Sequence, residues 1–560
     1  WEENLILHAD ALASKIDTLH PELNIKKIYL DSYQQSLSLG SQRYPEAQED
    51  LINVINDGSL IINYVGHGGE VGWASERVLE LSDINSLQNI DKLPVFITAT
   101  CEFTRYDDPT RISAGEYLLL NPNGGSIGLY STSRTVAESP TYALVNALYN
   151  YLPGQEINYS FGEALCKSKN DPLSGFSLVK RKFSFFGDPN LKIAQPNFNI
   201  NTISIELLDS VGQIIPFQGD TINSLSYVRI NGEILSSSNT LLTDYNGVLY
   251  ATVYDKPSLY STLNNDGFLS EPFNYELQNN IIYNGKVDIH GGLWSFEFIV
   301  PKDINYQYGS GKLSYYATDS IMGDASGFYE QFTVGGTSPY AAIDLNGPSI
   351  QLFMNDTNFV SGGYTNSSPE LFALLFDESG INTVGTGIGH DLTAILDDDI
   401  WSQYTLNDYY ESDLNSFKSG SVRYPFFDLF DGEHTLSVKA WDVHNNSSIV
   451  EISFFVTSSS DLAIQHLFNY PNPSSSFTNF VFEHNRPDQE LSITVDIFSL
   501  SGELIKTLSK NTYATGFRDA SIEWDIDSSI SRGIYIYRLS VKSEYDQSIA
   551  QKTEKLIIVR

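Results

Sequence analysis

Two side chains near the amino terminus, His67 and Cys101, have the types and the spacing for peptide-bond chemistry. His67 stands in a Gly-His-Gly-Gly loop directly after an apolar run, and Cys101 directly follows a second one, Leu93–Thr100. A thiol attacks a carbonyl as its thiolate, so it needs a base, which a histidine supplies before it protonates the leaving amine. The backbone N–H groups of Gly68 and Cys101 are candidates for an oxyanion hole. The pattern predicts a Cys–His pair that breaks amides.

Each of the two residues also has a simpler interpretation. Histidines in glycine-rich loops are mostly surface residues, and single cysteines after apolar strands mostly pack in a core. Joint placement favours catalysis, because both residues follow a strand and their 34-residue separation allows one helical crossover. Neighbouring parallel strands would then present both side chains at the edge where open α/β sheets bind ligands.

The elements that must position this pair alternate along residues 1–195. Helical apolar spacing and short apolar β-branched runs follow one another there, which predicts an α/β sheet that is mostly parallel. The expected helices are Leu5–Leu19, Ala47–Asp57, Ala114–Leu120 and Tyr142–Tyr151, and the expected strands are Lys27–Leu30, Gly58–Val65, Leu93–Thr98 and Gly124–Tyr130.

The rest of the chain has an all-β pattern. From about residue 197, short alternating segments separated by Gly, Asn, Asp, Ser and Pro predict β-sandwiches. We divide the chain into an α/β domain at 1–195, Ig-like β domains at 196–340 and 341–458, and a last β-sandwich at 459–560, after the Ser-rich stretch Thr457–Asp461. A length of 560 residues requires several cores of this kind.

The composition excludes several classes of function. The 33 Lys and Arg against 69 Asp and Glu give a net charge of −36, which repels phosphate backbones, so no nucleic-acid partner is expected. No apolar run approaches the roughly 20 residues of a membrane-spanning helix. Two cysteines cannot form a disulfide framework, and Cys166 is predicted to be a buried helical residue. The chain begins at Trp1 without an initiator Met, so we interpret it as a fragment or processed product.

Motifs in the first domain resemble one peptidase family. They are Asn-Tyr-Val-Gly-His-Gly at 63–68, Ala-Thr-Cys at 99–101 and Phe-Gly-Asp-Pro-Asn-Leu-Lys-Ile at 186–193. Together they are similar to the gingipain-type cysteine peptidases, which are caspase-like. Matches at Cys101–Pro109 and Gly385–Asp391 are similar to the type IX secretion sortases of Bacteroidota within that family. The resemblance implies that Cys101 is the nucleophile and His67 its partner.

The same resemblance implies three limits. The family's acidic residue that orients the histidine falls before Trp1, and Glu2 and Glu3 do not match it. The position that gives some members a basic preference aligns near Leu5, which cannot pair with a cation. Residues 1–195 resemble the C-terminal half of the family's catalytic domain, and the family's chemistry requires no cofactor.

Further residues on the two loops are candidates for substrate binding. They are Glu70, Trp73, Glu102 and Arg105. For Arg105 we favour a pair with an aspartate of its own loop, Asp107 or Asp108. For Trp73, packing against the Cys101 loop is an equally good interpretation.

No catalytic metal is predicted, but two acidic turns in the β domains offer oxygen ligands for structural calcium. They are Asp397–Asp399 and the group of Asp442, Asn445 and Asn446. Such turns are common in an anionic chain, so solvated turns are the alternative. His390, in a Gly-His-Asp sequence, is predicted to be structural.

The last segment resembles a second family. Asn-Tyr-Pro-Asn-Pro-Ser at 469–474, Gly-Ile-Tyr-Ile-Tyr-Arg-Leu at 533–539 and the terminal Lys-Leu-Ile-Ile-Val-Arg are similar to the C-terminal sorting domains of type IX cargo, although another adhesive β domain is the alternative. The resemblance implies a cell-surface location, held at the outer membrane by the β-barrel shuttle protein PorV. It also implies cargo C-terminal domains as substrates and lipopolysaccharide as the acceptor.

Three functions are compatible with these patterns. The first is a surface sortase that removes the C-terminal signal of cargo proteins and transfers them to water or to an amine on lipopolysaccharide. The second is a secreted gingipain-like endopeptidase whose own tail is removed after export. The third is a catalytically silent surface scaffold.

Overall fold

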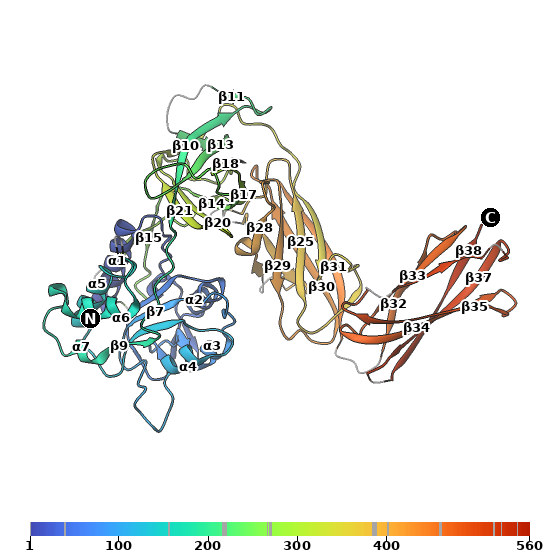
Figure 1. Cartoon of the computed structure of the whole chain (residues 1–560), viewed down its shortest axis with the longest axis horizontal. Coiled ribbons are helices and arrows are strands. Elements are labelled where there is room, and N and C mark those ends of the chain that lie inside the picture. The colour runs from blue at the N-terminus through green and yellow to red at the C-terminus, as the bar shows by residue number, and fades with distance from the viewer. Residues whose placement is uncertain are drawn as a thin grey trace.

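The computed structural model describes residues 2–559 except 39–40, 155–156, 216–220, 266, 268–270, 384–388, 400–402, 458–461, 519–520, 528 and 546. An α/β unit is followed by three β units, and the first and last units lie at opposite ends of the long axis (Figure 1). The predicted fold class, one α/β unit followed by all-β sandwich units, is confirmed. Among the helices so described, none has the length and apolar character of a membrane span.

A four-stranded sheet in the order β3-β7-β8-β9 forms the centre of the α/β unit. Its strands are β3 (Ile61–Val65), β7 (Val95–Ala99), β8 (Gly128–Thr132) and β9 (Phe183–Gly187). The first three run parallel and β9 runs antiparallel. Successive side chains of the fully buried β7 enter different cores, Phe96 on one face and Ile97 on the other, which is why this strand is apolar throughout.

Helices cover both faces of this sheet. On one face lie α1 (Glu2–Leu19), α5 (Glu138–Leu148) and α6 (Phe161–Asn170), and on the other α2 (Pro45–Asp57), α3 (Leu81–Ser86) and α4 (Ala114–Leu120). Shorter elements are η1 (Leu30–Ser32), β1 (Ser36–Ser38), β2 (Ser41–Arg43), β4 (Gly68–Gly69), β5 (Gly72–Trp73), β6 (Leu79–Glu80), η2 (Pro172–Ser174) and α7 (Val179–Lys182). A capping box starts α4, where the Ser113 N–H donates to the Glu116 carboxylate at 2.8 Å.

The predicted strand at Lys27–Leu30 is wrong. This segment forms no strand and leads into η1, because its neighbours bind the first β unit. The Leu263 N–H donates to the Asp31 carbonyl at 2.7 Å, and the N–H groups of Asn264 and Asn265 donate to the Asp31 carboxylate at 2.9 and 2.7 Å. Contact between two units, rather than strand pairing, therefore determines the conformation of this segment.

The first β unit surrounds a single large core. Its main sheet contains, in spatial order, β17 (Ile281–Ile289), β14 (Gly247–Tyr254), β20 (Lys312–Asp319), β21 (Gly323–Tyr329), β10 (Phe198–Leu208), β13 (Tyr227–Leu235) and β18 (Leu293–Ile299), with β11 (Ile214–Ile215) paired to β10. A smaller sheet contains β12 (Thr221–Ser224), β22 (Thr333–Thr337) and β19 (Gly309–Ser310), and β15 (Ser258–Ser261) pairs with β16 (Asn274–Leu277).

The second and third β units are sandwiches of two sheets each. In the second, β23 (Ser349–Met354), β25 (Glu370–Phe376), β29 (Ser419–Pro425) and β28 (Tyr410–Ser412) face β24 (Gly363–Thr365), β31 (Ser447–Val456), β30 (Gly432–Trp441), β26 (Thr393–Leu396) and β27 (Gln403–Thr405), with η3 (Asn407–Tyr409) between β27 and β28. In the third, β32 (Ile464–Tyr470), β33 (Phe477–His484) and β36 (Ser521–Asp525) face β35 (Leu504–Ala514), β34 (Gln489–Ser499), β37 (Gly533–Ser543) and β38 (Ile549–Ile558).

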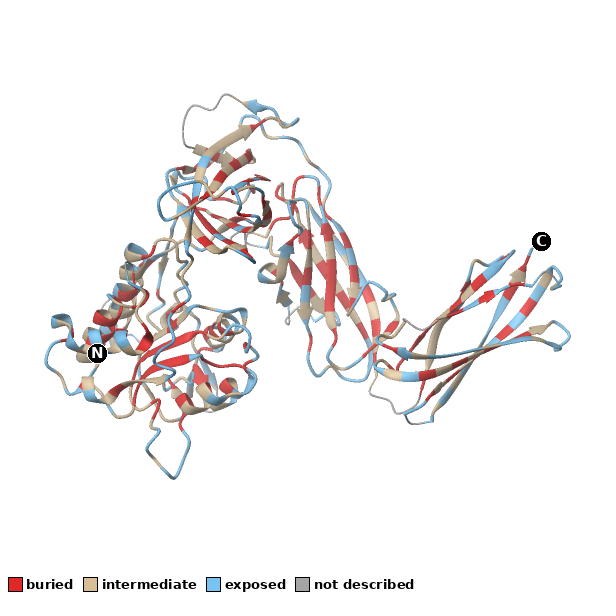
Figure 2. Ribbon diagram, in the orientation of Figure 1, coloured by how far each residue is buried: buried red, intermediate tan, exposed pale blue. Residues whose placement is uncertain are grey.

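Buried and exposed residues alternate along the long strands of these units (Figure 2). In β37 the tyrosines face inward, because Tyr535 and Tyr537 are buried while Ile534 and Ile536 are exposed. The predicted Ser-rich linker lies mostly outside the described residues.

Asp377, at the end of β25, is a buried carboxyl group that makes the second β unit sensitive to pH. The pKa of Asp377 is raised from 3.8 to about 7, chiefly by burial and also by the negative charges of Asp442, Asp344 and Glu378, while one N–H bond from Ser379 opposes the rise. The folded state then holds a proton that the unfolded state has lost. Stability from this group is therefore complete below pH 3.8 and declines as pH rises to about 7.

Replacement of Asp377 by asparagine is expected to stabilise the second β unit most above pH 7, since asparagine stays neutral and keeps the Ser379 bond. The stability gain over the wild type should grow from pH 4 to 7, by up to about 1.4 kcal/mol per pH unit. Calorimetry and hydrogen exchange of the β25 amides measure this difference. A gain that stays constant over the same range contradicts the prediction.

Candidate active site

The two predicted catalytic residues leave the central sheet side by side. In the parallel pair β3–β7, Val65 lies opposite Ala99, and the Gly66 N–H approaches the Ala99 carbonyl at 3.5 Å. His67 and Cys101 each come two residues after the last paired position. Two loops therefore start at one edge of the sheet, and we call them the His67 loop (residues 66–73) and the Cys101 loop (residues 100–113).

Cys101 is half-buried against a third segment that joins β8 to α5. Its Sγ atom accepts a weak bond from the Val136 N–H at 3.4 Å and lies 3.5 Å from the Val136 carbonyl oxygen. The same segment is tied to the Cys101 loop by the Thr132 hydroxyl, which donates to the Thr100 carbonyl at 2.5 Å. Val136 therefore holds the Cys101 side chain through both its N–H and its carbonyl group.

The His67 side chain is exposed, and its backbone is fixed. Its carbonyl accepts hydrogen bonds from the Tyr64 hydroxyl at 2.6 Å and from the Ala74 N–H at 2.8 Å. Within the described part of the chain, the imidazole makes no hydrogen bond, either to Cys101 or to an acidic residue that would orient it. Catalytic hydrogen bonds often close only when substrate binds, so this geometry is compatible with His67 as the base for Cys101.

Gly68 brings the His67 loop close to the Cys101 loop. A Cβ at this position would lie 2.5 Å from Thr100 Oγ1 and 3.1 Å from the Gly72 carbonyl oxygen, so a larger residue would push the two loops apart. The predicted oxyanion N–H groups, those of Gly68 and Cys101, thus belong to backbone that is held close together.

Trp73 does not contact substrate, which corrects one of the two interpretations offered for it. The side chain is 1% exposed and stacks on Tyr64 at 4.3 Å, with Phe96 and Phe103 at 5.9 and 5.6 Å between ring centroids. A buried indole cannot form the floor of an open pocket. Trp73 instead packs the His67 loop onto the core.

Arg105 pairs across the two loops rather than mainly within its own. Its Nη1 lies 2.5 Å from Glu70 Oε1, whereas Asp108 is 3.9 Å away and Glu102 is 3.8 Å away. Asp107 pairs with Arg134 instead. The expected pair of Arg105 with an aspartate of its own loop is present only as the long contact with Asp108. The short contact of Arg105 is with Glu70, whose carboxylate therefore binds arginine.

Of two further predictions, the one for Cys166 is wrong and the one for His390 agrees with the structure. Cys166 is exposed on α6, not buried as predicted, because the buried positions of that helix are Phe161, Ala164 and Ser168. His390 has a structural contact, since its Nδ1 lies 2.7 Å from Asp303 of the first β unit.

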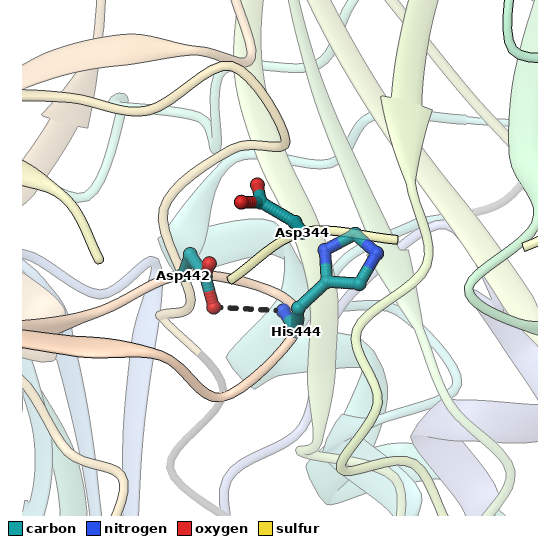
Figure 3. A group of neighbouring side chains, drawn as sticks. All are labelled: Asp344, Asp442 and His444. Carbon is teal, nitrogen blue, oxygen red and sulfur yellow. Dashed lines mark hydrogen bonds between the residues drawn. The ribbon is translucent and has the colours of Figure 1, made fainter. Parts of the chain in front are cut away.

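In each acidic turn proposed for calcium, one aspartate already accepts hydrogen bonds from the protein. The Asp397 carboxylate binds the His434 ring and the Thr435 N–H. Asp442 forms, with Asp344 and His444, a group whose candidate ligand atoms lie within 4.8 Å of one another (Figure 3). The Asp442 carboxylate oxygens already accept hydrogen bonds from the backbone N–H groups of His444 and Asn446 and from the Asn446 side-chain amide. Calcium at this group stays a prediction.

Sequence reasoning missed a contact between α1 and α5 that lies next to the segment contacting Cys101. Glu138, two residues after Val136, lies 2.5 Å from His8 of α1, and the His8 ring stacks on Tyr142 at 3.8 Å. No spacing signal links these residues, because a complete strand and a loop separate Cys101 from this segment. The contact depends on the tertiary arrangement of α1 and α5.

Comparisons with known proteins give two family matches. Residues 1–194 match the model of peptidase family C25, and residues 469–559 match that of the secretion system C-terminal sorting domain. A search of curated proteins gives no match.

Solved structures with similarity include dimeric latent PorU from Porphyromonas gingivalis, at 28% identity over 72% of this chain and 38% of that chain, with a TM-score of 0.32. The complex of Porphyromonas gingivalis RgpB pro- and mature domains matches at 14% identity over 57% of this chain and 63% of that chain, with a TM-score of 0.29. The chain thus spans 38% of the PorU chain.

Proposed function

Because residues 1–194 belong to peptidase family C25 and residues 469–559 to the secretion-system sorting domains, we propose that this chain is a PorU-like cysteine peptidase of the type IX secretion system that acts at the cell surface. Its substrates are cargo proteins, and the bond it cuts joins each cargo protein to its C-terminal sorting domain. The observation that carries this proposal is the register of β3 and β7, from which both His67 and Cys101 follow at the same sheet edge.

The reaction is an acyl transfer. The Cys101 thiolate attacks the scissile carbonyl, while the backbone N–H groups of Gly68 and Cys101 bind the developing oxyanion. His67 takes the thiol proton and gives it to the leaving amine, which departs with the sorting domain and leaves the cargo as a thioester on Cys101. Water or an amine on lipopolysaccharide then attacks the thioester and releases the cargo.

A hydrogen bond between Arg518 of the third β unit and Asn358 of the second supports retention of the tail and so favours the sortase over the secreted endopeptidase. The Glu483 carboxylate, 3% exposed, binds His466 Nδ1 at 2.8 Å and lies 3.7 Å from Arg518. Arg518 also donates to the Asn358 carbonyl of the second unit at 3.2 Å. The Glu483 contacts orient Arg518 within the tail, and a tail that contacts the second unit in this way fits a protein that keeps it for binding an outer-membrane partner such as PorV.

Mass spectrometry of a purified cargo protein incubated with this chain tests the proposal. The expected products are the free sorting domain and a cargo protein whose new C-terminus is either a free carboxylate, formed by water, or an amide, formed by the added amine. If the amine is never incorporated, transpeptidation is excluded while hydrolysis remains. If no sorting domain is released, the peptidase assignment fails and the silent scaffold is favoured.

A further inference from the structure

Glu70 connects the two loops of the candidate active site through its side chain. Its carboxylate is only 11% exposed and faces two guanidinium groups, with Arg105 Nη1 at 2.5 Å from Oε1 and Arg111 Nη1 at 2.9 Å from Oε2. Glu70 lies three residues after His67, and both arginines belong to the Cys101 loop. Each carboxylate oxygen of Glu70 therefore contacts one arginine of the Cys101 loop.

The backbone of Glu70 makes the same connection. Its carbonyl accepts the N–H of Ala114 at 2.7 Å, at the start of α4 where the Cys101 loop ends. The side chain and the main chain of Glu70 thus both connect the His67 loop to the Cys101 loop. The side chain binds Arg105 and Arg111, and the main chain binds Ala114, just after the Cys101 loop ends.

The burial and charge of this group give the ion pairs more weight than surface pairs have. Removing the partners of the largely buried Glu70 carboxylate costs more than breaking an exposed pair, whereas Arg105 and Arg111, at 35% and 61% exposed, remain partly solvated. The other acids near the arginines, Asp108 and Glu102, stay at 3.8–3.9 Å and cannot replace the short contacts. The neutral amide of glutamine at position 70 would therefore leave Arg105 only the longer contacts with Glu102 and Asp108, and Arg111 only the longer contact with Asp108.

The position of His67 relative to Cys101 depends on such links. Among the described residues, no hydrogen bond joins the imidazole to the sulfur or fixes the ring. The titratable and charged groups on the segments that meet at Cys101 include His67 and Glu70 on the His67 loop and Arg134 on the third segment, with Glu138 at the start of α5. Those on the Cys101 loop itself are Glu102, Arg105, Asp107, Asp108 and Arg111.

We propose that Glu70 is a positioning residue for the acyl-transfer reaction. Through its ion pairs with Arg105 and Arg111 it holds the His67 loop at the distance from Cys101 at which the imidazole can take the thiol proton. This inference rests on the proposed function, because it takes His67 and Cys101 as the reacting pair.

The pH profile of Cys101 alkylation by iodoacetamide tests the inference without any cargo protein. It is measured for the wild type, Glu70→Gln, Arg105→Lys and His67→Ala, in a Cys166→Ala background so that one thiol reports. Glu70→Gln should move the profile toward that of His67→Ala by about one pH unit, which is about a tenfold slower reaction near pH 7. Arg105→Lys keeps the positive charge but loses the planar guanidinium with its several donors, so it should shift the pH profile less.

The matched control is Arg77→Gln, which breaks an exposed pair with Glu80 (3.0 Å) in the same unit and should leave the profile unchanged. Thermal melting of each variant is recorded beside the profile. A Glu70→Gln protein that melts earlier but keeps the wild-type profile overturns the positioning role and leaves Glu70 structural. Coinciding profiles for the wild type and His67→Ala overturn the reacting pair itself, and the inference with it.

Discussion

A Cys101→Ala protein is expected to release no sorting domain from cargo, with a loss of rate on the order of 10³-fold or more. The reason is that the proposed reaction passes through a thioester on this sulfur. The fold should be retained, because Cys101 is half-buried and, within the described residues, its sulfur makes only the two long hydrogen bonds with Val136. Release of the sorting domain is measured by mass spectrometry, and folding by thermal melting.

The matched control for this experiment is Cys166→Ala. That thiol is exposed on α6 and is not on either loop, so its removal should leave cargo processing unchanged. Normal processing by the Cys101→Ala protein would refute the nucleophile assignment. Loss of processing in the Cys166→Ala protein would show that the wrong thiol had been chosen.

A His67→Ala protein is expected to show the second-largest effect, a loss of cargo cleavage of about 10²–10⁴-fold. Without the imidazole, Cys101 loses its base and the leaving amine loses its acid. Alkylation of Cys101 should then follow the pH dependence of an ordinary thiol, whose pKa is about 8.5, and should be slower at neutral pH than in the wild type.

His290→Ala provides the control, since His290 is an exposed histidine of the first β unit. It should change neither cleavage nor alkylation. If His67→Ala alkylates at the wild-type rate throughout the pH range, the sulfur and the imidazole do not act together. A normal cleavage rate in the same variant would argue that another residue is the acid–base catalyst.

The position of the candidate site was predictable because the information is local. An apolar run followed by Gly-His-Gly, and a second run followed by Cys101, specify two strand ends, and parallel pairing brings such ends to one edge. The α/β alternation and the later all-β pattern are equally local, since they depend on the spacing of apolar residues.

Partners across loops were not predictable in this way. Arg105 had aspartates close in sequence, yet it pairs with Glu70, 35 residues earlier, because the two loops pack together. Trp73 and Val136 likewise have contacts that follow from the packing of distant elements.

The exposure of Cys166, in contrast, could have been predicted correctly from the helix alone. Phe161, Ala164 and Ser168 recur at helical spacing and mark the inner face of α6, and Cys166 lies off that face.

The contact of Asp31 and Tyr29 with the first β unit bears on how a minimal enzyme can be made. In a chain cut near residue 195, the Asp31 carboxylate would lose the N–H groups of Asn264 and Asn265. The Tyr29 ring would also lose its contact with the Tyr275 ring, whose centroid lies 4.8 Å away. Shortened versions for kinetics or crystallisation should therefore run at least to Thr337, where β22 ends.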